Sequence, residues 1–166
     1  MSRLSRFLEI ATNSAVLVLC LLIGSVLIRN WLVAPPSSQS SRQIVIGSKL
    51  DITGVAWASE PKTIVLGLST QCHFCSESTP FYARLMKAAS EKHRRTIAVF
   101  PQNADESSKY LSSKQLQFDK VVSAPLDSIH VNGTPTLLIV DSSGKIRSAW
   151  VGKLQRQSED EILASL

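Results

Sequence analysis

Residues 69–82, STQCHFCSESTPFY, hold two cysteines two residues apart, between an apolar run and a helical pattern. The preceding run, TIVLGLST at 63–70, is rich in β-branched and apolar residues, and both faces of a strand formed by it would be apolar. This pattern predicts a strand inside a sheet that helices cover. From Cys72 to about Ser90, apolar residues recur at three- and four-residue steps, which predicts an amphipathic helix. The cysteine pair is therefore expected at a junction between a strand and a helix.

Two cysteines at such a junction are suited to disulfide exchange. The free N–H groups and the positive dipole end of a helix's first turn favour a thiolate at Cys72, and Cys75 is close enough in sequence to resolve a mixed disulfide. Zinc sites use the same spacing but need further ligands, and the sequence offers His73, His93 and His130. A structural disulfide would close a loop too small to add much stability. We favour a redox pair over both alternatives.

The rest of the chain predicts a single α/β domain. RTIAVF at 95–100 predicts a second strand, and residues 104–118 predict a second helix or helical turn. After KVVSA at 120–124, residues 133–152 predict a β-hairpin with its turn at Asp141 to Gly144. A closing helix follows, and a chain of this length can bury one core.

Three finer features are also predicted. The stretch 42–62 should be irregular, with one or two short strands. Ile146 and Trp150 should share one face of the last strand, because they are four residues apart. Ser158, with Glu161 three residues later, is the pattern of a capping box at the start of the closing helix.

The N-terminal segment predicts a membrane anchor. Residues 10–28 carry no formal charge and would span about 29 Å as a helix, and basic residues precede them. A cleaved signal peptide normally has a shorter apolar region that ends in small residues, whereas VAPP follows here. We therefore expect a cytoplasmic N-terminus at 1–9, a transmembrane anchor at 10–33, a linker at 34–42 and a folded domain at 43–166.

The charge pattern argues against nucleic-acid binding. The formal net charge is +5, but basic and acidic side chains are interspersed along the chain after the N-terminal segment and form no block. Nucleic-acid-binding surfaces need a basic stripe or patch. No nucleic-acid partner is predicted.

The motifs together resemble a known superfamily. The apolar strand, CHFC, Pro80 eight residues after the first cysteine, and GTPT followed by an apolar strand and DSSGK resemble the thioredoxin superfamily from about Thr63 onward. The N-terminal span and VNGTPTLLIVDSSGKI are similar to membrane-anchored thiol-disulfide oxidoreductases of the bacterial envelope, the TlpA/ResA-like branch that includes cytochrome c maturation proteins. The resemblance implies an α/β thioredoxin-like fold with a central mixed sheet flanked by helices.

The resemblance also implies roles for particular residues. Cys72 would be the attacking thiol and Cys75 the resolving thiol, while Thr134 and a cis Pro135 would contact an extended substrate. Pro80 would kink the active-site helix. It implies no cofactor besides the redox-active disulfide, and its partners would be envelope proteins with thiols or disulfides and a redox protein that reloads the pair. The domain would lie on the periplasmic side of the inner, cytoplasmic membrane.

Some positions depart from the superfamily pattern. Thioredoxins carry Trp where Gln71 precedes the first cysteine, and their buried proton-transferring acid falls here on Leu66. Glu77 is a weak candidate for replacing that acid. A protonated His73 would stabilise the Cys72 thiolate, or its imidazole would be exposed and idle.

Two alternative functions remain open from the sequence. Ser69, three residues before Cys72, matches peroxidatic thiol sites, but Val65 stands where those sites carry a proline. Thiolates also bind copper, so Cys72, Cys75 and His130 would be the ligands of a copper-delivery module.

Overall fold

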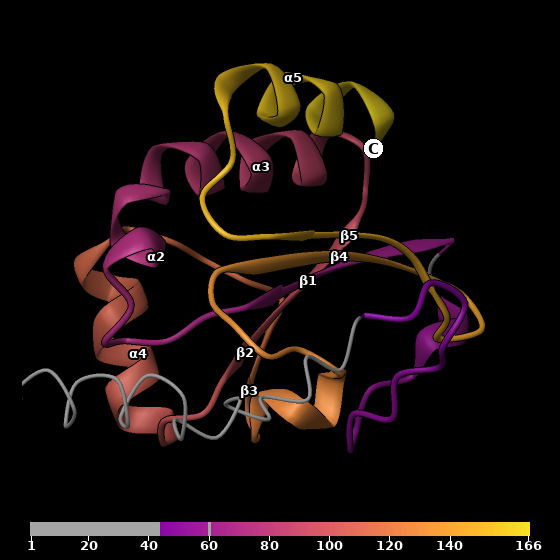
Figure 1. Cartoon of the computed structure of the whole chain (residues 1–166), viewed down its shortest axis with the longest axis horizontal. Coiled ribbons are helices and arrows are strands. Elements are labelled where there is room, and N and C mark those ends of the chain that lie inside the picture. The colour runs from indigo at the N-terminus through magenta and orange to yellow at the C-terminus, as the bar shows by residue number, and fades with distance from the viewer. Residues whose placement is uncertain (1–43, 60) are drawn as a thin grey trace, which may run out of the picture. The chain divides into compact units, whose positions relative to one another are not determined.

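The fold is built on one five-stranded mixed sheet. A computed structural model describes residues 44–59 and 61–166 (Figure 1). The strands are β1 (Lys62–Gly67), β2 (Arg95–Phe100), β3 (Lys120–Ser123), β4 (Thr136–Asp141) and β5 (Ile146–Val151). The helices are η1 (Trp57–Ser59), α2 (His73–Glu77), α3 (Thr79–Glu91), α4 (Ala104–Ser113), η2 (Leu126–Ile129) and α5 (Arg156–Ser165).

The strand order is β3-β2-β1-β4-β5. β1, β2 and β3 run parallel, while β4 runs antiparallel to both β1 and β5. Almost every residue of β1, β2 and β4 is buried, which explains why their sequences are continuously apolar. The predicted α/β fold with a mixed sheet is confirmed.

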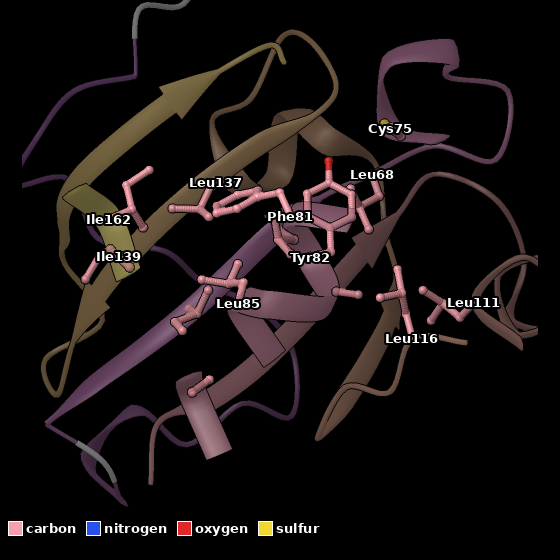
Figure 2. Packing of buried hydrophobic residues seen from close by; sticks show 14 of the residues in the cluster. Leu68, Cys75, Phe81, Tyr82, Leu85, Leu111, Leu116, Leu137, Ile139 and Ile162 are labelled. Carbon is pink, nitrogen blue, oxygen red and sulfur yellow. The ribbon is translucent and has the colours of Figure 1, made fainter. Parts of the chain in front are cut away.

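Each face of the sheet has its own hydrophobic core. On one face Leu66, Phe100 and Leu137 pack with apolar residues of α3, α4 and α5. Figure 1 shows α3 and α5 lying together over this face, and Figure 2 shows its packed side chains. On the other face Val65 and Leu138 pack against the lead-in before β1 and against η2.

The helical stretch predicted from Cys72 to about Ser90 is divided into two helices, and the break lies next to Pro80, where a kink is expected. α2 ends at Glu77, Ser78 is buried between the two helices, and α3 begins at Thr79 with Pro80 in its first turn. Proline fits there because it has no N–H to donate and its φ suits a helix start. The Ser78 hydroxyl donates to the Phe74 carbonyl, 2.8 Å away, and satisfies one of the acceptors at the end of α2.

The prediction that Ile146 and Trp150 share a face is wrong. The hairpin turn lies where the sequence predicts it, with the Gly144 N–H donating to the Asp141 carbonyl. However, the β4–β5 register shifts between Ile139 and Val140, which is a bulge. The extra residue rotates the strand, so Ile146 packs in one core and Trp150 against the other.

The start of the last helix also differs from the prediction. α5 begins at Arg156 with Gln155 as N-cap, so Ser158 lies inside the helix and does not cap it. Arg84 of α3 binds carboxylates in the first part of α5, including that of Asp160 at 2.7 Å. This contact joins the first part of α5 to α3.

The lead-in to β1 is irregular, as expected, but forms no strand among its described residues. Its extended pairing there is limited to one isolated bridge between Lys49 and Lys145, while Leu50 and Ile52 are buried. The expected N-terminus, anchor and linker (1–9, 10–33 and 34–42) lie outside the described residues. Within 44–59 and 61–166, no helix is long and apolar enough to span a bilayer.

Candidate active site

The sheet brings the cysteine pair and Pro135 to the same edge. Gly67, the last residue of β1, is paired with Thr136, the first residue of β4. Because the two strands are antiparallel, the chain leaving β1 and the chain entering β4 meet at one edge of the sheet. Cys72, in the loop after β1, therefore lies beside the turn that carries Pro135.

Cys72 is the accessible member of the pair. It is half-buried and is the N-cap of α2, where its sulfur accepts a hydrogen bond from the Cys75 N–H at 3.1 Å. Its thiol donates to the Thr134 carbonyl at 3.3 Å. The sulfur is thus held by both predicted parts of the site, the cysteine motif and the Thr134–Pro135 turn.

Cys75 is the buried member of the pair. Its side chain has no exposed surface and packs in the core beneath α2. Burial first, and then the hydrogen bond with Cys72, raise the pKa of the Cys75 thiol to about 12. Both cysteines are free thiols in the structure. One accessible and one buried thiol are arranged as an attacking and a resolving group would be.

The Thr134–Pro135 peptide bond is cis, as the resemblance implies. Pro135 is buried, and its carbonyl accepts a hydrogen bond from the Gly152 N–H at 2.7 Å. The Thr136 hydroxyl donates to the Gly133 carbonyl at 2.7 Å, which fixes the other side of the turn. The Thr134 carbonyl is left directed at Cys72.

Gln102 supports the loop that carries Cys72, a role that sequence analysis missed. It follows β2, whose end lies beside that of β1, and its side-chain amide donates to Ser69 Oγ at 3.0 Å. Its side-chain oxygen accepts the Thr70 N–H at 3.3 Å. Glu106 of α4 accepts the Thr70 hydroxyl in the same network. The only sequence signal was the position of Gln102 directly after a predicted parallel strand.

His73 is the most exposed group of the motif. Its side chain is 79% exposed, and its ring lies 3.0 Å from the Glu77 carboxylate, one helical turn on. Lys153 also binds Glu77, at 2.9 Å, and is the main reason that the pKa of Glu77 lies below its usual range. Glu77 is therefore a surface carboxylate in ion pairs, which makes it a poor proton acceptor for the buried Cys75.

The structure does not assemble the proposed copper ligands. The His130 ring lies near the Lys49 carbonyl at 3.4 Å. Over residues 44–59 and 61–166, no three His, Cys, Asp or Glu side chains are grouped so that they could hold a metal ion. His130 is thus not brought to the cysteines, which corrects that ligand set. Ser69, the residue behind the peroxidase alternative, is bound to Gln102.

Comparison with solved structures identifies the fold. A candidate thiol:disulfide interchange protein DsbE from Chlorobium tepidum matches with a TM-score of 0.59 and 21% identity, over 74% of this chain and 99% of that chain. StoA from Bacillus subtilis matches with a TM-score of 0.54 and 15% identity, over 72% and 93%. A thiol-disulfide isomerase from Corynebacterium glutamicum matches with a TM-score of 0.53 and 15% identity, over 75% and 93%.

The sequence matches no family model and no curated protein. Structural similarity at sequence identities of 15% to 21% identifies the fold of the chain but not its activity. The chain therefore has the thioredoxin-like fold, and thiol:disulfide interchange proteins are among its structural neighbours.

Proposed function

We propose that this protein is a membrane-tethered thiol-disulfide oxidoreductase that exchanges its Cys72–Cys75 pair with proteins of the bacterial envelope. The observation that carries the proposal is the unequal pair itself. Cys72 is accessible and contacts the Thr134 carbonyl, while Cys75 is buried with its N–H directed at the Cys72 sulfur. The names of the structural neighbours agree with this chemistry.

In the oxidation of the pair, the Cys72 thiolate attacks a substrate disulfide. One sulfur of that disulfide leaves with the bonding electrons, and Cys72 is joined to the other in a mixed disulfide. Cys75 then loses its proton and attacks Cys72, which releases the second substrate sulfur and forms the Cys72–Cys75 disulfide. Two electrons pass to the substrate, and the reverse sequence oxidises a substrate dithiol.

The Thr134 carbonyl supplies a contact for the substrate chain. In the dithiol state it accepts a hydrogen bond from the Cys72 thiol. Once Cys72 is a thiolate, that proton is gone and the carbonyl is free to accept a backbone N–H from an extended substrate. Phe74, 54% exposed between the two cysteines, offers an apolar contact beside the same point.

Replacement of single cysteines tests the proposal. The chain has a third cysteine, Cys20, in the N-terminal segment. The experiments use the full chain in mild detergent with Cys20→Ala throughout, so that only the pair reacts. Cys75→Ser should accumulate a mixed disulfide with a protein disulfide substrate, and Cys72→Ser should form none and lose turnover. Turnover that survives Cys72→Ser would reject the proposed exchange reaction.

The reduction potential then defines the direction of exchange. The Cys72–Cys75 disulfide is equilibrated against glutathione or dithiothreitol buffers. A potential near −270 mV would make the protein a donor of electrons to envelope disulfides, whereas about −120 to −180 mV would make it an oxidant or isomerase. Failure of the pair to form a disulfide in any buffer would exclude a redox function.

The membrane tether is a separate part of the proposal and rests on the uncharged run at 10–28. In a bacterial host, the full chain should sediment with the inner membrane and resist extraction with alkaline carbonate. A membrane-impermeant maleimide should label Cys72 in intact spheroplasts. Recovery in the soluble fraction, or labelling only after lysis, would contradict the proposed location.

A further inference from the structure

Basic residues gather at the end of the sheet that lies away from the cysteines. β1, β2, β3 and β5 all start at this end, because β4 alone runs in the opposite direction. Each of these strands starts with a basic residue or directly after one, and these residues are Lys62, Arg95, Lys120 and Lys145. They are far apart in the sequence, so only the fold brings them into one row across the end of the sheet.

The loops at the two ends of the strands carry charges of opposite sign. The basic end consists of four segments, 44–62, 91–96, 119–120 and 141–147. These segments hold eight Lys and Arg against five Asp and Glu. The cysteine end consists of the loops 67–79, 101–106, 124–136 and 151–154. These loops hold one Lys against four Asp and Glu. The domain is therefore polarised along its strands, with the excess of positive charge at the end away from Cys72.

The lysines of the basic end keep their charge uncompensated. Lys62 and Lys120 donate to backbone carbonyls, those of Ser165 and Gly54. Lys62, Lys120 and Lys145 form no ion pair with any residue in 44–59 or 61–166. A hydrogen bond to a neutral carbonyl positions an ammonium group but leaves its charge in place. This end can therefore attract an anionic partner.

Two lysines also face each other at the basic end. Lys49 and Lys145 are partners in an isolated antiparallel bridge, and both side chains are exposed. Like charges directly opposite one another destabilise a β pairing. An anion bound between the two ammonium groups would relieve this repulsion. The pair is thus a second observation, independent of the charge count, that indicates an anionic partner.

Exposed apolar side chains lie beside this lysine pair. Val45 is 63% exposed and Ile46 is 56% exposed. The Gly47 N–H donates to the Ile146 carbonyl at 2.7 Å, which holds this stretch beside the start of β5 (Figure 1). Cations next to exposed apolar side chains are typical of surfaces that bind at the interface of a bilayer.

The length of the linker limits how far the basic end can lie from the proposed anchor. The predicted linker, 34–42, spans at most about 30 Å when it is fully extended. The described domain starts just after it, at residue 44, and its first residues belong to the basic end. A tethered domain would therefore keep Val45, Ile46 and Lys49 within that distance of the anchor.

We propose that the basic end binds the surface of a bilayer that contains anionic phospholipids. Lys49 and Lys145 contact the phosphate headgroups, and Val45 and Ile46 enter the boundary between headgroups and acyl chains. The inference rests on the membrane tether of the proposed function. The negative surface attracts the basic end and not the acidic loops around Cys72. The cysteine end is thereby directed away from the bilayer, toward the proteins with which it exchanges disulfides.

Fluorescent labels on the full chain in vesicles test this orientation. All chains carry Cys20→Ala and a single nitrobenzoxadiazole label. In one chain the label is attached to Ser142→Cys, an exposed position in the β4–β5 turn, together with Cys72→Ser and Cys75→Ser. In the other it is attached to the native Cys72, together with Cys75→Ser. Spin-labelled lipids then quench whichever label approaches the bilayer.

The label at position 142 should be the one that is quenched. In vesicles with about one third phosphatidylglycerol and about 0.1 M salt, its quenching should exceed that of the Cys72 label about threefold or more. In about 1 M salt, where the screening length falls to about 3 Å, this excess should disappear. It should also be absent from vesicles of phosphatidylcholine alone, which carry no net charge.

Paired lysine variants separate a local site from net charge. Lys49→Gln with Lys145→Gln should lower the quenching at position 142 about twofold or more, because it removes the facing cations. Lys87→Gln with Lys109→Gln is the matched control, since it removes the same charge from exposed positions of α3 and α4. The control should leave the quenching unchanged. An equal loss in both variants would overturn the role of the lysine pair.

The other possible results separate this inference from the proposed function. A chain that does not float with the vesicles would reject the proposed tether. A chain that floats but shows equal quenching of the two labels would overturn the docking of the basic end and leave the tether intact. Quenching at position 142 that is the same with phosphatidylcholine would also overturn it. Disulfide exchange is measured separately with the cysteine variants, so its failure would not be mistaken for either result.

Discussion

The two ends of the strands hold their titratable groups in opposite surroundings. At the end away from the cysteines, the Asp141 carboxylate accepts hydrogen bonds from Ser143, from the Lys145 N–H and from Arg147. At the cysteine end, Cys75 is buried in the apolar core. The first arrangement surrounds a carboxylate with hydrogen-bond donors, whereas the second removes a thiol from water.

This difference appears in the direction of the pKa shifts. Hydrogen bonds, led by that from Ser143, hold the pKa of Asp141 well below its usual range. Burial raises the pKa of Cys75 to about 12. The bonded carboxylate at the turn serves stability, whereas the buried thiol lies beside an accessible one with which it can form a disulfide. The end of the strands that carries the raised pKa is therefore the end that carries the candidate site.

The largest expected effect is the pH dependence of disulfide closure. Only the thiolate of Cys75 attacks, and burial raises the pKa of this thiol, so the attacking fraction keeps rising with pH through the neutral range. A dithiobis-nitrobenzoate probe releases one coloured thiolate when Cys72 attacks it and a second when Cys75 resolves the mixed disulfide, and between pH 7 and 9 this second release should accelerate about tenfold or more. A rate that levels off below pH 8 would show that Cys75 is not held in its protonated form by burial.

Gln102→Ala should have the next largest effect, because it removes two hydrogen bonds from the loop that carries Cys72. The first release should slow about threefold to tenfold, as expected for the loss of one to two neutral hydrogen bonds that position the sulfur. Gln157→Ala is the matched control, since Gln157 bonds only to Glu161 on the exposed side of α5. Equal rates in the two variants would remove Gln102 from the site.

Asp141→Asn tests the opposite edge. The low pKa of Asp141 means that its contribution to stability is present above the ordinary range near pH 4 and is lost as pH falls through the lower folded value. At pH 7 the variant should melt a few degrees below the wild type, and the gap should narrow toward pH 2. Probe release should not change, so a slower first or second release would show that the two edges are coupled.

The sequence predicts much of this architecture because local patterns carry it. The buried strands β1, β2 and β4 are continuous apolar runs, and the Asp141 turn has its own signature of polar residues and glycine. Gly144 adopts a left-handed φ of +80°, which glycine accepts without strain. Such features are decided within a few residues and can be recognised before the fold is known.

Other features depend on contacts between distant segments. The bulge at Ile139 and Val140 places Ile146 and Trp150 on opposite faces of the sheet. No sequence pattern in β5 indicates this bulge. The first part of α5 is bound by Arg84, which belongs to another helix. Gln102 is part of the site only because the ends of β1 and β2 are neighbours. Sequence reasoning finds the cysteines and the proline, but only packing shows what surrounds them.

The smallest expected effect concerns His73, which remains a proposed stabiliser of the Cys72 thiolate. Its imidazole is 79% exposed and paired with Glu77, so water and a carboxylate both weaken its field at the sulfur. His73→Ala should slow the first release by no more than about twofold. Glu77→Gln should act in the opposite sense, because it removes the carboxylate that pairs with the imidazole. If His73→Ala leaves the rate unchanged, the imidazole has no part in activating Cys72, and the sulfur's reactivity comes from its position at the start of α2 and beside Thr134.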